Sequence, residues 1–279
     1  MVLVTGATGK IGSHAVHVLA DAKVPTRALL RDPAKAKDWS GVEIAQGNLD
    51  DAASVAAALA GVDNAVLITT ANSEQEIAFI AAAKNAGVQK VVKISSMGAD
   101  ATSKISMARG HAQAEAALKA SGLKWTILRP GTFAQNFLQF ADSIKKDGKF
   151  FASVKQGRVA TIDVRDIAEV AVKAVTSHDL DGRTIILTGD DAISYEDAAR
   201  ILGTAIGKKV DYVDLPPEKT KKGMLDRGMP AWLADELVLL QENIAKTMEP
   251  VVTRDVQKIL GHPARKFDDF ARDYADFFK

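Results

Sequence analysis

Short apolar runs alternate along the chain with segments whose apolar residues recur at helical spacing. The runs are nearly continuous in hydrophobic residues, as is typical of strands buried on both faces of a parallel sheet. The segments between them combine an apolar stripe with polar faces, which predicts amphipathic helices. Six strands are expected before residue 131, at residues 2–4, 25–31, 42–47, 64–70, 90–96 and 125–129.

Regular alternation of strands and helices is typical of an α/β fold. Right-handed crossovers then predict a doubly wound parallel Rossmann sheet that binds its ligand at the carboxyl ends of the strands. After residue 131 the pattern becomes less regular, with short strands expected at 149–153, 159–162 and 183–188. A capping box is expected at Ser194 and Asp197, where a further helix begins.

We therefore predict an NAD(P)-binding Rossmann domain and a smaller C-terminal substrate lobe. We expect the domain over residues 1–188 and the lobe over 189–279, with the alternative that part of 131–160 joins the lobe. Within the lobe, a basic, glycine-containing linker is expected after Pro217, followed by a helix over 231–247. That helix is either a lid over the substrate or an amphipathic helix packed on the core.

Three glycines follow the first strand at a spacing typical of dinucleotide-binding proteins. Gly6 permits a sharp turn, Gly9 lets the backbone approach a pyrophosphate, and Gly12 lets the next helix pack closely on the strand. The N-terminus of that helix offers backbone N–H groups and a positive dipole end to an anion. The residues expected to hold the cofactor here are Gly6, Ala7, Thr8, Gly9, Lys10, Ile11 and Gly12.

The ends of the following strands predict the rest of the cofactor site. Arg31, at the end of the second strand, favours NADP(H) because an arginine there accommodates the 2′-phosphate, although Asp32 is a competing acid that would suit NAD. Lys35 is either a second cation for the phosphate or a solvated helix residue. Asn48 and Leu49 end the third strand, where adenine is expected to lie. The site is completed by Thr69, Thr70 and Ser95.

Composition excludes several classes of site and partner. The 279 residues carry a formal charge of +1, which gives no general attraction to nucleic acid or an anionic membrane. No apolar run is long enough to span a bilayer, and a strand begins at the N-terminus, so we expect a cytoplasmic protein. The absence of cysteine excludes thiolate chemistry. No carboxylate is evident beside His14 and His17, so no metal site is expected.

Several motifs together give the chain a family resemblance. They lie at residues 5–12, 31–33, 94–96, 121–131, 163–168 and 252–255, with Phe133 and Asn136 beside the fourth. In these motifs the chain resembles the NmrA-like atypical short-chain dehydrogenases, which include NADPH-dependent quinone, triphenylmethane and azo reductases. The resemblance implies that the glycine turn holds the pyrophosphate, that Arg31 meets the 2′-phosphate, and that Phe133 and Asn136 lie beside the nicotinamide.

One departure from ordinary short-chain dehydrogenases affects the expected chemistry. Those enzymes carry a catalytic tyrosine and, four residues later, a lysine, whereas the matching positions here are His111 and Glu115. The three tyrosines, at 195, 212 and 274, lie far downstream. His111 and Glu115 either form an exposed i,i+4 pair, or His111 contacts the cofactor ribose or donates a proton.

These features support two functional hypotheses. The first is an NADPH-dependent reductase that passes hydride to a small aromatic, electron-poor acceptor, such as a quinone, an azo dye or a triphenylmethane cation, because such acceptors tolerate the loss of a positioned acid. The second is an NADP(H)-sensing regulator that binds a protein partner, since the same motifs describe cofactor binding rather than turnover. A sugar-nucleotide epimerase is disfavoured, because that chemistry depends on the missing tyrosine and lysine. The chain is expected to be a monomer or a homodimer.

Overall fold

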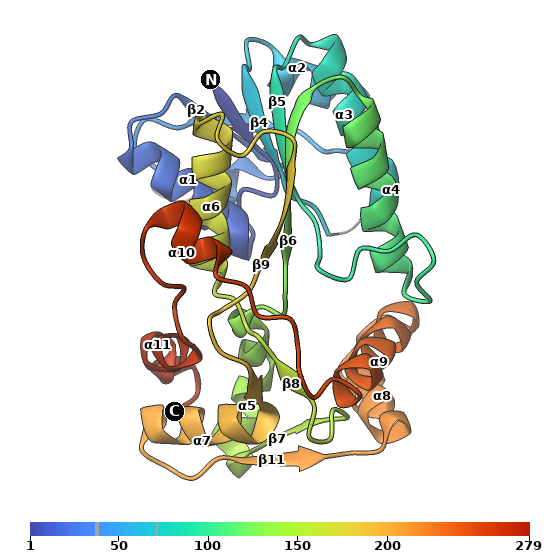
Figure 1. Cartoon of the computed structure of the whole chain (residues 1–279), viewed down its shortest axis with the longest axis vertical. Helices are drawn as coiled ribbons and strands as arrows, with labels where there is room; N and C mark the ends of the chain where they lie inside the picture. The colour runs from blue at the N-terminus through green and yellow to red at the C-terminus, as the bar shows by residue number, and fades with distance from the viewer. Residues whose placement is uncertain (37–38, 71) are drawn as a thin grey trace. The chain divides into compact units, whose positions relative to one another are not determined.

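Seven parallel strands form the main sheet of the computed structural model, which describes residues 1–36, 39–70 and 72–279 (Figure 1). The strand order is β3-β2-β1-β4-β5-β6-β9, and every pairing within it is parallel. This confirms the predicted doubly wound sheet. The strands are β1 (Val2–Val4), β2 (Thr26–Leu30), β3 (Glu43–Gln46), β4 (Asn64–Leu67), β5 (Lys90–Ile94), β6 (Lys124–Pro130) and β9 (Arg183–Leu187).

Helices cover both faces of this sheet. On one side α1 packs against α6, and on the other α3 packs against α4 (Figure 1). The strands between them are therefore buried on both sides, which explains their nearly continuous apolar runs. The helical elements are α1 (Lys10–Asp21), the 3₁₀ turn η1 (Pro33–Lys35), α2 (Ala52–Leu59), α3 (Ser73–Asn85), α4 (Ser106–Ala120), α6 (Val164–Thr176) and α10 (Asp255–Leu260).

The chain divides into two compact units that do not follow a single cut in the sequence. Unit 1 holds the seven-stranded sheet and comprises Met1–Pro130, Val164–Leu187 and Asp255–His262. Unit 2 comprises Gly131–Asp163, Thr188–Arg254 and Pro263–Lys279. Residues 255–262, which lie in the segment assigned to the C-terminal lobe from sequence, thus pack with unit 1, where α10 contacts α6 and β9.

Unit 2 is built around an aromatic core and two small sheets. Strands β10 and β8 pair antiparallel, and β11 and β7 pair parallel. The Phe137 ring packs edge-on against Phe150 and Phe267, with ring centroids 6.0 and 4.8 Å apart. The elements are η2 (Ala134–Phe140), α5 (Ala141–Asp147), β7 (Lys149–Ala152), β8 (Arg158–Val159), β10 (Ile193–Ser194), α7 (Tyr195–Ile206), β11 (Asp211–Asp214), α8 (Pro217–Asp226), α9 (Ala231–Ala245), α11 (Phe267–Asp273) and η3 (Ala275–Phe277).

The structure corrects two sequence-based expectations in unit 2 and confirms one. The expected basic linker is the helix α8, which begins at Pro217, where a proline's fixed φ and missing N–H are tolerated, and buries Thr220 and Met224 one turn apart. The strand expected over 159–162 is only two residues long, at Arg158–Val159. The predicted capping box is confirmed, because the Ser194 and Asp197 side chains each accept the other residue's backbone N–H.

Helix α9 lies where one helix was expected, and most of its residues are half-buried. Only Ala234 and Ile244 are buried along it, whereas Trp232 is 59% exposed and Leu240 is 41% exposed. Its nearest neighbour in unit 2 is α8, to which it is joined by an ion pair from Lys221 to Asp235 at 2.5 Å.

Candidate functional site

The glycine turn between β1 and α1 has the geometry that the motif requires. Gly6 has a backbone φ of +57°, a conformation that residues with a side chain rarely adopt. A Cβ on Gly12 would lie 2.2 Å from the Gly6 carbonyl oxygen, so only glycine fits against the turn. A Cβ on Gly9 would meet only that same oxygen, at 3.1 Å, so the protein itself leaves the outer side of Gly9 open. An approaching phosphate is the physical reason for a glycine there.

The N-terminus of α1 is prepared for an anion. Gly9 is the N-cap, and among the residues described no side chain caps the helix and no acid occupies its first turn. The first N–H groups of a helix have no partners within the helix and carry its positive dipole end. A pyrophosphate therefore fits this position in charge and in hydrogen bonding.

Thr5 holds the glycine turn at the point where the strand order reverses. Its hydroxyl donates to the Ile68 carbonyl at 2.9 Å and accepts the Ile68 N–H at 2.8 Å. These bonds join the carboxyl ends of β1 and β4, which are neighbours in the sheet although β2 and β3 lie between them in sequence. Ligands of open α/β sheets bind at such a reversal, because the connecting helices leave there on opposite faces.

Arg31 follows β2 directly and is exposed, with no ion pair to any residue that the structure describes. The competing acid is engaged elsewhere, since the Asp32 carboxylate accepts the Ala34 N–H at 3.0 Å and caps η1. Lys35, in the last turn of η1, is also exposed. The end of β2 therefore offers a guanidinium that has no ion-pair partner among the described residues, while the Asp32 carboxylate caps η1.

The residues expected around the adenine and the mid-region of a dinucleotide follow β3 and β4. Asn48 is exposed and its side chain accepts the Asp50 N–H at 3.3 Å, while Leu49 is half-buried. Thr70 is exposed, and the Thr69 hydroxyl donates to Glu76 Oε1 at 2.8 Å. Because neighbouring parallel strands end at one edge of the sheet, these side chains share that edge with the glycine turn.

A buried ion pair lies behind this edge. Lys93 on β5 and Glu76 on α3 are both 0% exposed, and Lys93 Nζ lies 2.6 Å from Glu76 Oε1. Lys93 Nζ also approaches the Ile94 carbonyl and His111 Nδ1, each at 3.3 Å. The other oxygen of Glu76, Oε2, is buried with no hydrogen-bond partner in the described structure. Thr69, at the end of β4, is thus linked through Glu76 and Lys93 to His111.

His111 is held in its neutral form. Burial of the imidazole, together with the positive charge of Lys93, lowers its pKa to about 4. Glu115 opposes this effect, and Arg129 adds to it. At neutral pH the ring is therefore not an imidazolium and cannot act as an ordinary proton donor. A neutral imidazole still donates one hydrogen bond.

Glu115 is not the exposed partner of His111 that its i,i+4 spacing suggested. The carboxylate is 3% exposed and accepts two hydrogen bonds from Arg129 on β6, Nε to Oε1 at 2.8 Å and a terminal nitrogen to Oε2 at 2.6 Å. The Ser95 hydroxyl donates to Oε1 at 2.6 Å. Burial raises the pKa of Glu115, but the bonds from Arg129 and Ser95 outweigh it and lower the pKa. The side chain of Ser95, expected beside the cofactor, is thereby committed to Glu115.

Phe133 and Asn136 belong to unit 2. Phe133 pairs with Ile162 in a parallel bridge and precedes the 3₁₀ helix η2, whose Ala134 N–H donates to the Ile162 carbonyl at 2.9 Å. Asn136 is exposed in that helix, and Phe133 is half-buried. Their expected position beside a nicotinamide comes from the family resemblance.

Sequence reasoning missed Lys93, Glu76 and Arg129. The signal for Lys93 was a lysine inside an otherwise apolar strand, because a central parallel strand tolerates a charge only when it is paired. Glu76 gave no comparable signal, since an acid in the first turn of a helix usually faces solvent and stabilises the helix dipole. Arg129 stood within a family motif but carried no assigned partner.

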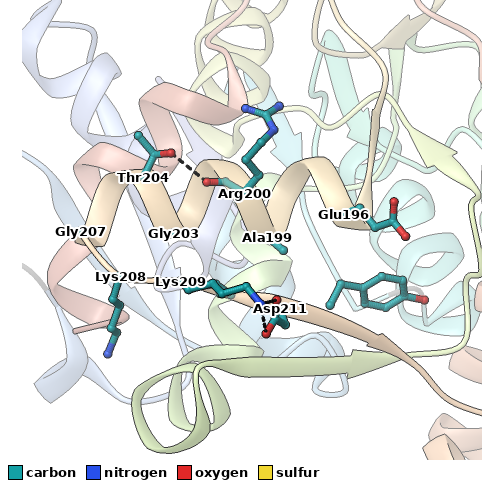
Figure 2. A pocket seen from close by; sticks show the side chains of 11 residues that line it. Glu196, Ala199, Arg200, Gly203, Thr204, Gly207, Lys208, Lys209 and Asp211 are labelled. Atoms are coloured by element: carbon teal, nitrogen blue, oxygen red, sulfur yellow. Dashed lines mark hydrogen bonds and ion pairs between the residues drawn. The ribbon is translucent and has the colours of Figure 1, made fainter.

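A separate hollow of about 740 Å³ opens on unit 2, between α7 and the segment that leads into β11 (Figure 2). Ala199 and Gly203 lie along its α7 wall, and Glu196, Arg200, Lys208 and Lys209 lie around it. Two of these charges are paired within the protein, Arg200 with Asp197 at 3.4 Å and Lys209 with Asp211 at 2.8 Å. The hollow has none of the buried polar groups found behind the glycine turn.

Among the residues that the structure describes, no three or more histidine and acidic side chains gather in a way that could hold a metal ion. The sequence suggested no carboxylate beside His17, but Asp21 lies 3.8 Å from its Nε2, one turn along α1 and with both side chains exposed. None of the described helices has the length and hydropathy needed to cross a membrane.

Comparison with solved structures supports the same architecture. The crystal structure of the NADPH-dependent quinone oxidoreductase from Escherichia coli complexed with NADPH matches with a TM-score of 0.87 at 29% identity, over 98% of this chain and 99% of that chain. The triphenylmethane reductase of Citrobacter sp. complexed with NADP(H) matches with a TM-score of 0.86 over 99% of this chain and 100% of that chain. At 23% identity, the second match shows the fold alone.

Sequence comparison identifies the family. The chain is 38% identical to the NAD(P)H azoreductase of Xenophilus azovorans over 283 residues, which is 100% of this chain and 99% of the relative. It is 30% identical to quinone oxidoreductase 2 of Escherichia coli over 271 residues, which is 94% of each protein. Residues 1–271 match the NmrA-like family as a whole. The chain therefore belongs to the NmrA-like family, as its motifs predicted.

Proposed function

We propose that this protein is an NADPH-dependent reductase that transfers hydride to an electron-poor aromatic acceptor, such as a quinone, an azo dye or a triphenylmethane cation, without a tyrosine and lysine acid pair. One observation carries the proposal: the position of the usual catalytic tyrosine holds His111, a neutral imidazole against a buried ammonium group. The position of the usual lysine holds Glu115, which is already engaged by Arg129.

The cofactor site we propose lies along the carboxyl edge of the sheet in unit 1. The backbone of residues 6–12 would hold the pyrophosphate, because the turn is open at Gly9 and, among the described residues, no side chain caps α1 and no acid occupies its first turn. Asn48 and Leu49 would contact the adenine, and Thr69, Thr70 and Ser95 the remainder. Phe133 and Asn136 are proposed for the nicotinamide side on family resemblance.

The preference for NADPH over NADH is proposed from the end of β2. The Arg31 guanidinium is exposed and unpaired among the described residues, and it can donate two parallel hydrogen bonds to a phosphate. Asp32 would have to leave its cap on η1 to bind a ribose hydroxyl. Lys35 adds a second positive charge within the same short segment.

The lack of a positioned acid decides which acceptors suit the site. NADPH supplies a hydride when bound, and the protein's part is to hold the acceptor against it and to exclude water. Ketone reduction produces a strongly basic alkoxide and needs an acid, whereas a reduced quinone is a weaker base and a carbocation becomes neutral. A neutral His111 can stabilise charge by donating a hydrogen bond but is a poor proton donor.

The named relatives point to the same chemistry. They are an NAD(P)H azoreductase, a quinone oxidoreductase and, by fold, a triphenylmethane reductase. All three names describe reductases or oxidoreductases, and a quinone and a triphenylmethane cation can take up hydride without a tyrosine acid. We accordingly propose unit 2 as the substrate lobe, in a protein that acts as a monomer or a homodimer.

Anaerobic NADPH oxidation against a panel of quinones, azo dyes and cationic dyes tests the proposal. The expected result is acceptor-dependent oxidation by the wild-type protein, which Gly9→Val abolishes because that variant cannot bind the cofactor. Comparison with a simple aldehyde and ketone panel is needed, since efficient carbonyl reduction would contradict the absence of an acid. Tight NADPH binding with no acceptor reduced at all would favour the NADP(H)-sensing alternative.

A further inference from the structure

We propose that Lys93 is a positioning residue that holds His111 as a neutral imidazole with its proton on Nε2, so that His111 presents a hydrogen-bond donor to the cofactor or acceptor. This inference rests on the proposed function for the identity of the ligand. The state of the imidazole itself follows from groups within unit 1 and can be measured without any ligand.

The number of donors on Lys93 determines which group donates in its hydrogen bond with His111. A lysine ammonium has three N–H donors and no acceptor. Its three neighbours are Glu76 Oε1 at 2.6 Å, the Ile94 carbonyl at 3.3 Å and His111 Nδ1 at 3.3 Å. Two of these are acceptors by chemistry, and the third donor therefore points at Nδ1. Nδ1 must accept, which leaves the single proton of the neutral ring on Nε2.

The surroundings of His111 keep the ring neutral over a wide pH range. The charged groups that face it are Lys93 on β5, Arg129 on β6, Glu115 on its own helix and, behind Lys93, Glu76 on α3. Glu115 is bound by Arg129 through both oxygens, and Glu76 is bound by Lys93. Burial of the ring is the largest effect that lowers the pKa of His111, and the positive charge of Lys93 is the next. Each carboxylate is held by a cation, so neither offsets these two effects.

The placement of Nε2 suits contact with a ligand. Helix α4 follows β5 and leads to β6, so it begins at the carboxyl edge of the sheet, and His111 lies one turn nearer to that edge than Glu115. The ring is half-buried, and within the described structure its only hydrogen-bond partner is Lys93. Nε2–H therefore remains available to an oxygen or nitrogen of the ligand.

Lys93 also supplies a positive charge that short-chain dehydrogenases usually obtain from a lysine on the helix. The usual lysine of short-chain dehydrogenases would stand at position 115, where this chain has an acid, and the ammonium beside residue 111 comes instead from the strand below it. Lys93 thus influences residue 111 from β5 rather than from α4. A positive charge beside the ring favours its neutral form, so the imidazole does not change its charge near neutral pH. It then offers the same hydrogen-bond donor throughout that range.

Histidine NMR on the protein without ligand tests the inference. The variant Glu76→Gln/Lys93→Met removes both charges together and so avoids leaving Glu76 buried without its partner. The matched control is Lys90→Met/Asp181→Asn, which removes another lysine buried in β5, whose Nζ contacts Asp181 and the Ala174 and Ser177 carbonyls. The His111 signals are assigned by their loss in His111→Gln.

We expect the wild-type His111 nitrogens to show a protonated Nε2 and an unprotonated Nδ1, with no titration between pH 5.5 and 8. In Glu76→Gln/Lys93→Met the pKa of His111 should rise by about one pH unit or more, and in the control it should not change. A proton on Nδ1 in the wild type would overturn the inference, whether or not the double variant folds. An unchanged His111 pKa in a folded Glu76→Gln/Lys93→Met would also overturn it.

NADPH titrations at pH 4.5, 5.0, 5.5, 6.5 and 7.5 test the contact with the ligand. Above pH 5, wild-type affinity should not change with protonation of His111, whereas the affinity of Glu76→Gln/Lys93→Met should change as pH passes the raised pKa of His111. The absence of such a change would overturn the ligand contact, even if the NMR result holds. Failure of the wild type to bind NADPH would instead overturn the proposed function, and the ligand-free NMR result would still decide the role of Lys93.

Discussion

Arg129 and Glu115 form a two-point ion pair inside unit 1, with Nε to Oε1 at 2.8 Å and a terminal guanidinium nitrogen to Oε2 at 2.6 Å. The pair joins β6 to α4, and Ser95 adds a third bond from the end of β5. It therefore fixes α4, which carries His111, against two strands of the sheet. Position 115 serves the packing of the site, whereas an ordinary short-chain dehydrogenase would have its lysine there.

Glu115→Gln should lower the free energy of unfolding by about 1.5 to 3 kcal/mol, because a charge-assisted pair is lost and Arg129 remains partly buried. The matched control is Glu43→Gln, which breaks the similarly two-pointed pair with Arg27, where Glu43 is 51% exposed. That change should cost about 0.2 to 1 kcal/mol. Urea unfolding at pH 7 checks both values. Equal losses in the two variants would contradict the structural role of Glu115.

The same pair should make stability depend on acid pH. The pKa of Glu115 is lower in the folded protein than in the unfolded chain, because the bonds from Arg129 and Ser95 outweigh the effect of burial. Its contribution is therefore present above the unfolded value of about 4.3 and is lost as pH falls through the folded value. The gap in unfolding free energy between wild type and Glu115→Gln should be constant from pH 7 to 5 and should shrink below pH 4. A constant gap down to pH 3 would contradict the linkage.

The sequence alone predicted the parts of the fold that depend on local pattern. Apolar runs such as Val2–Val4 identify buried strands because such a strand has no polar face, and the Ser194 and Asp197 spacing identifies a cap because both bonds form within one turn. Helix α8 escaped prediction since it is strongly polar and buries only Thr220 and Met224. It packs against α9, and the local sequence of α8 does not encode that contact.

The candidate site divides in the same way. The roles of the glycines could be predicted because their spacing reflects the backbone geometry of the turn, and Gly6 indeed has a positive φ. The buried pair of Lys93 with Glu76 joins residues on two elements, and nothing within either element specifies the partner. The interpretation of His111 and Glu115 as an exposed i,i+4 pair was wrong for the same reason, because the Glu115 carboxylate is 3% exposed and is bound at 2.6 Å by Arg129 on β6.

Arg31→Ala should weaken NADPH binding by roughly ten- to a hundredfold and leave NADH binding nearly unchanged. The lost contact is a charge-assisted bond to the 2′-phosphate, which contributes about 1.5 to 3 kcal/mol and which NADH cannot make. Fluorescence titration of both cofactors measures the ratio. The control is Arg200→Ala, an exposed arginine in unit 2, which should change neither affinity. Equal weakening of the two cofactors in Arg31→Ala would place the 2′-phosphate elsewhere.

Gly9→Val and Gly12→Ala should fail in different ways. Gly9 has φ −77° and ψ 176°, which valine adopts readily, and its side chain would point into the open space proposed for the pyrophosphate. Gly9→Val should therefore fold and lose cofactor binding. A Cβ on Gly12 would lie 2.2 Å from a backbone oxygen, so Gly12→Ala should lower the thermal midpoint as well. Circular dichroism and cofactor titration separate the two, and tight NADPH binding by Gly9→Val would show that the phosphate site is misplaced.

His111→Ala should leave quinone or dye reduction within about tenfold of wild type, because a neutral imidazole contributes a hydrogen bond and not a proton. A positioned general acid typically contributes about 10² to 10⁴ in rate, so the two roles separate clearly. Turnover must be measured at saturating NADPH, since a weaker contact with the cofactor could otherwise pass for a chemical defect. A thousandfold loss of turnover at saturation, with NADPH affinity intact, would identify His111 as a proton donor. That result would require its pKa to rise well above 4 once the ligands are bound, and the pH profile of turnover would then show a histidine near neutrality.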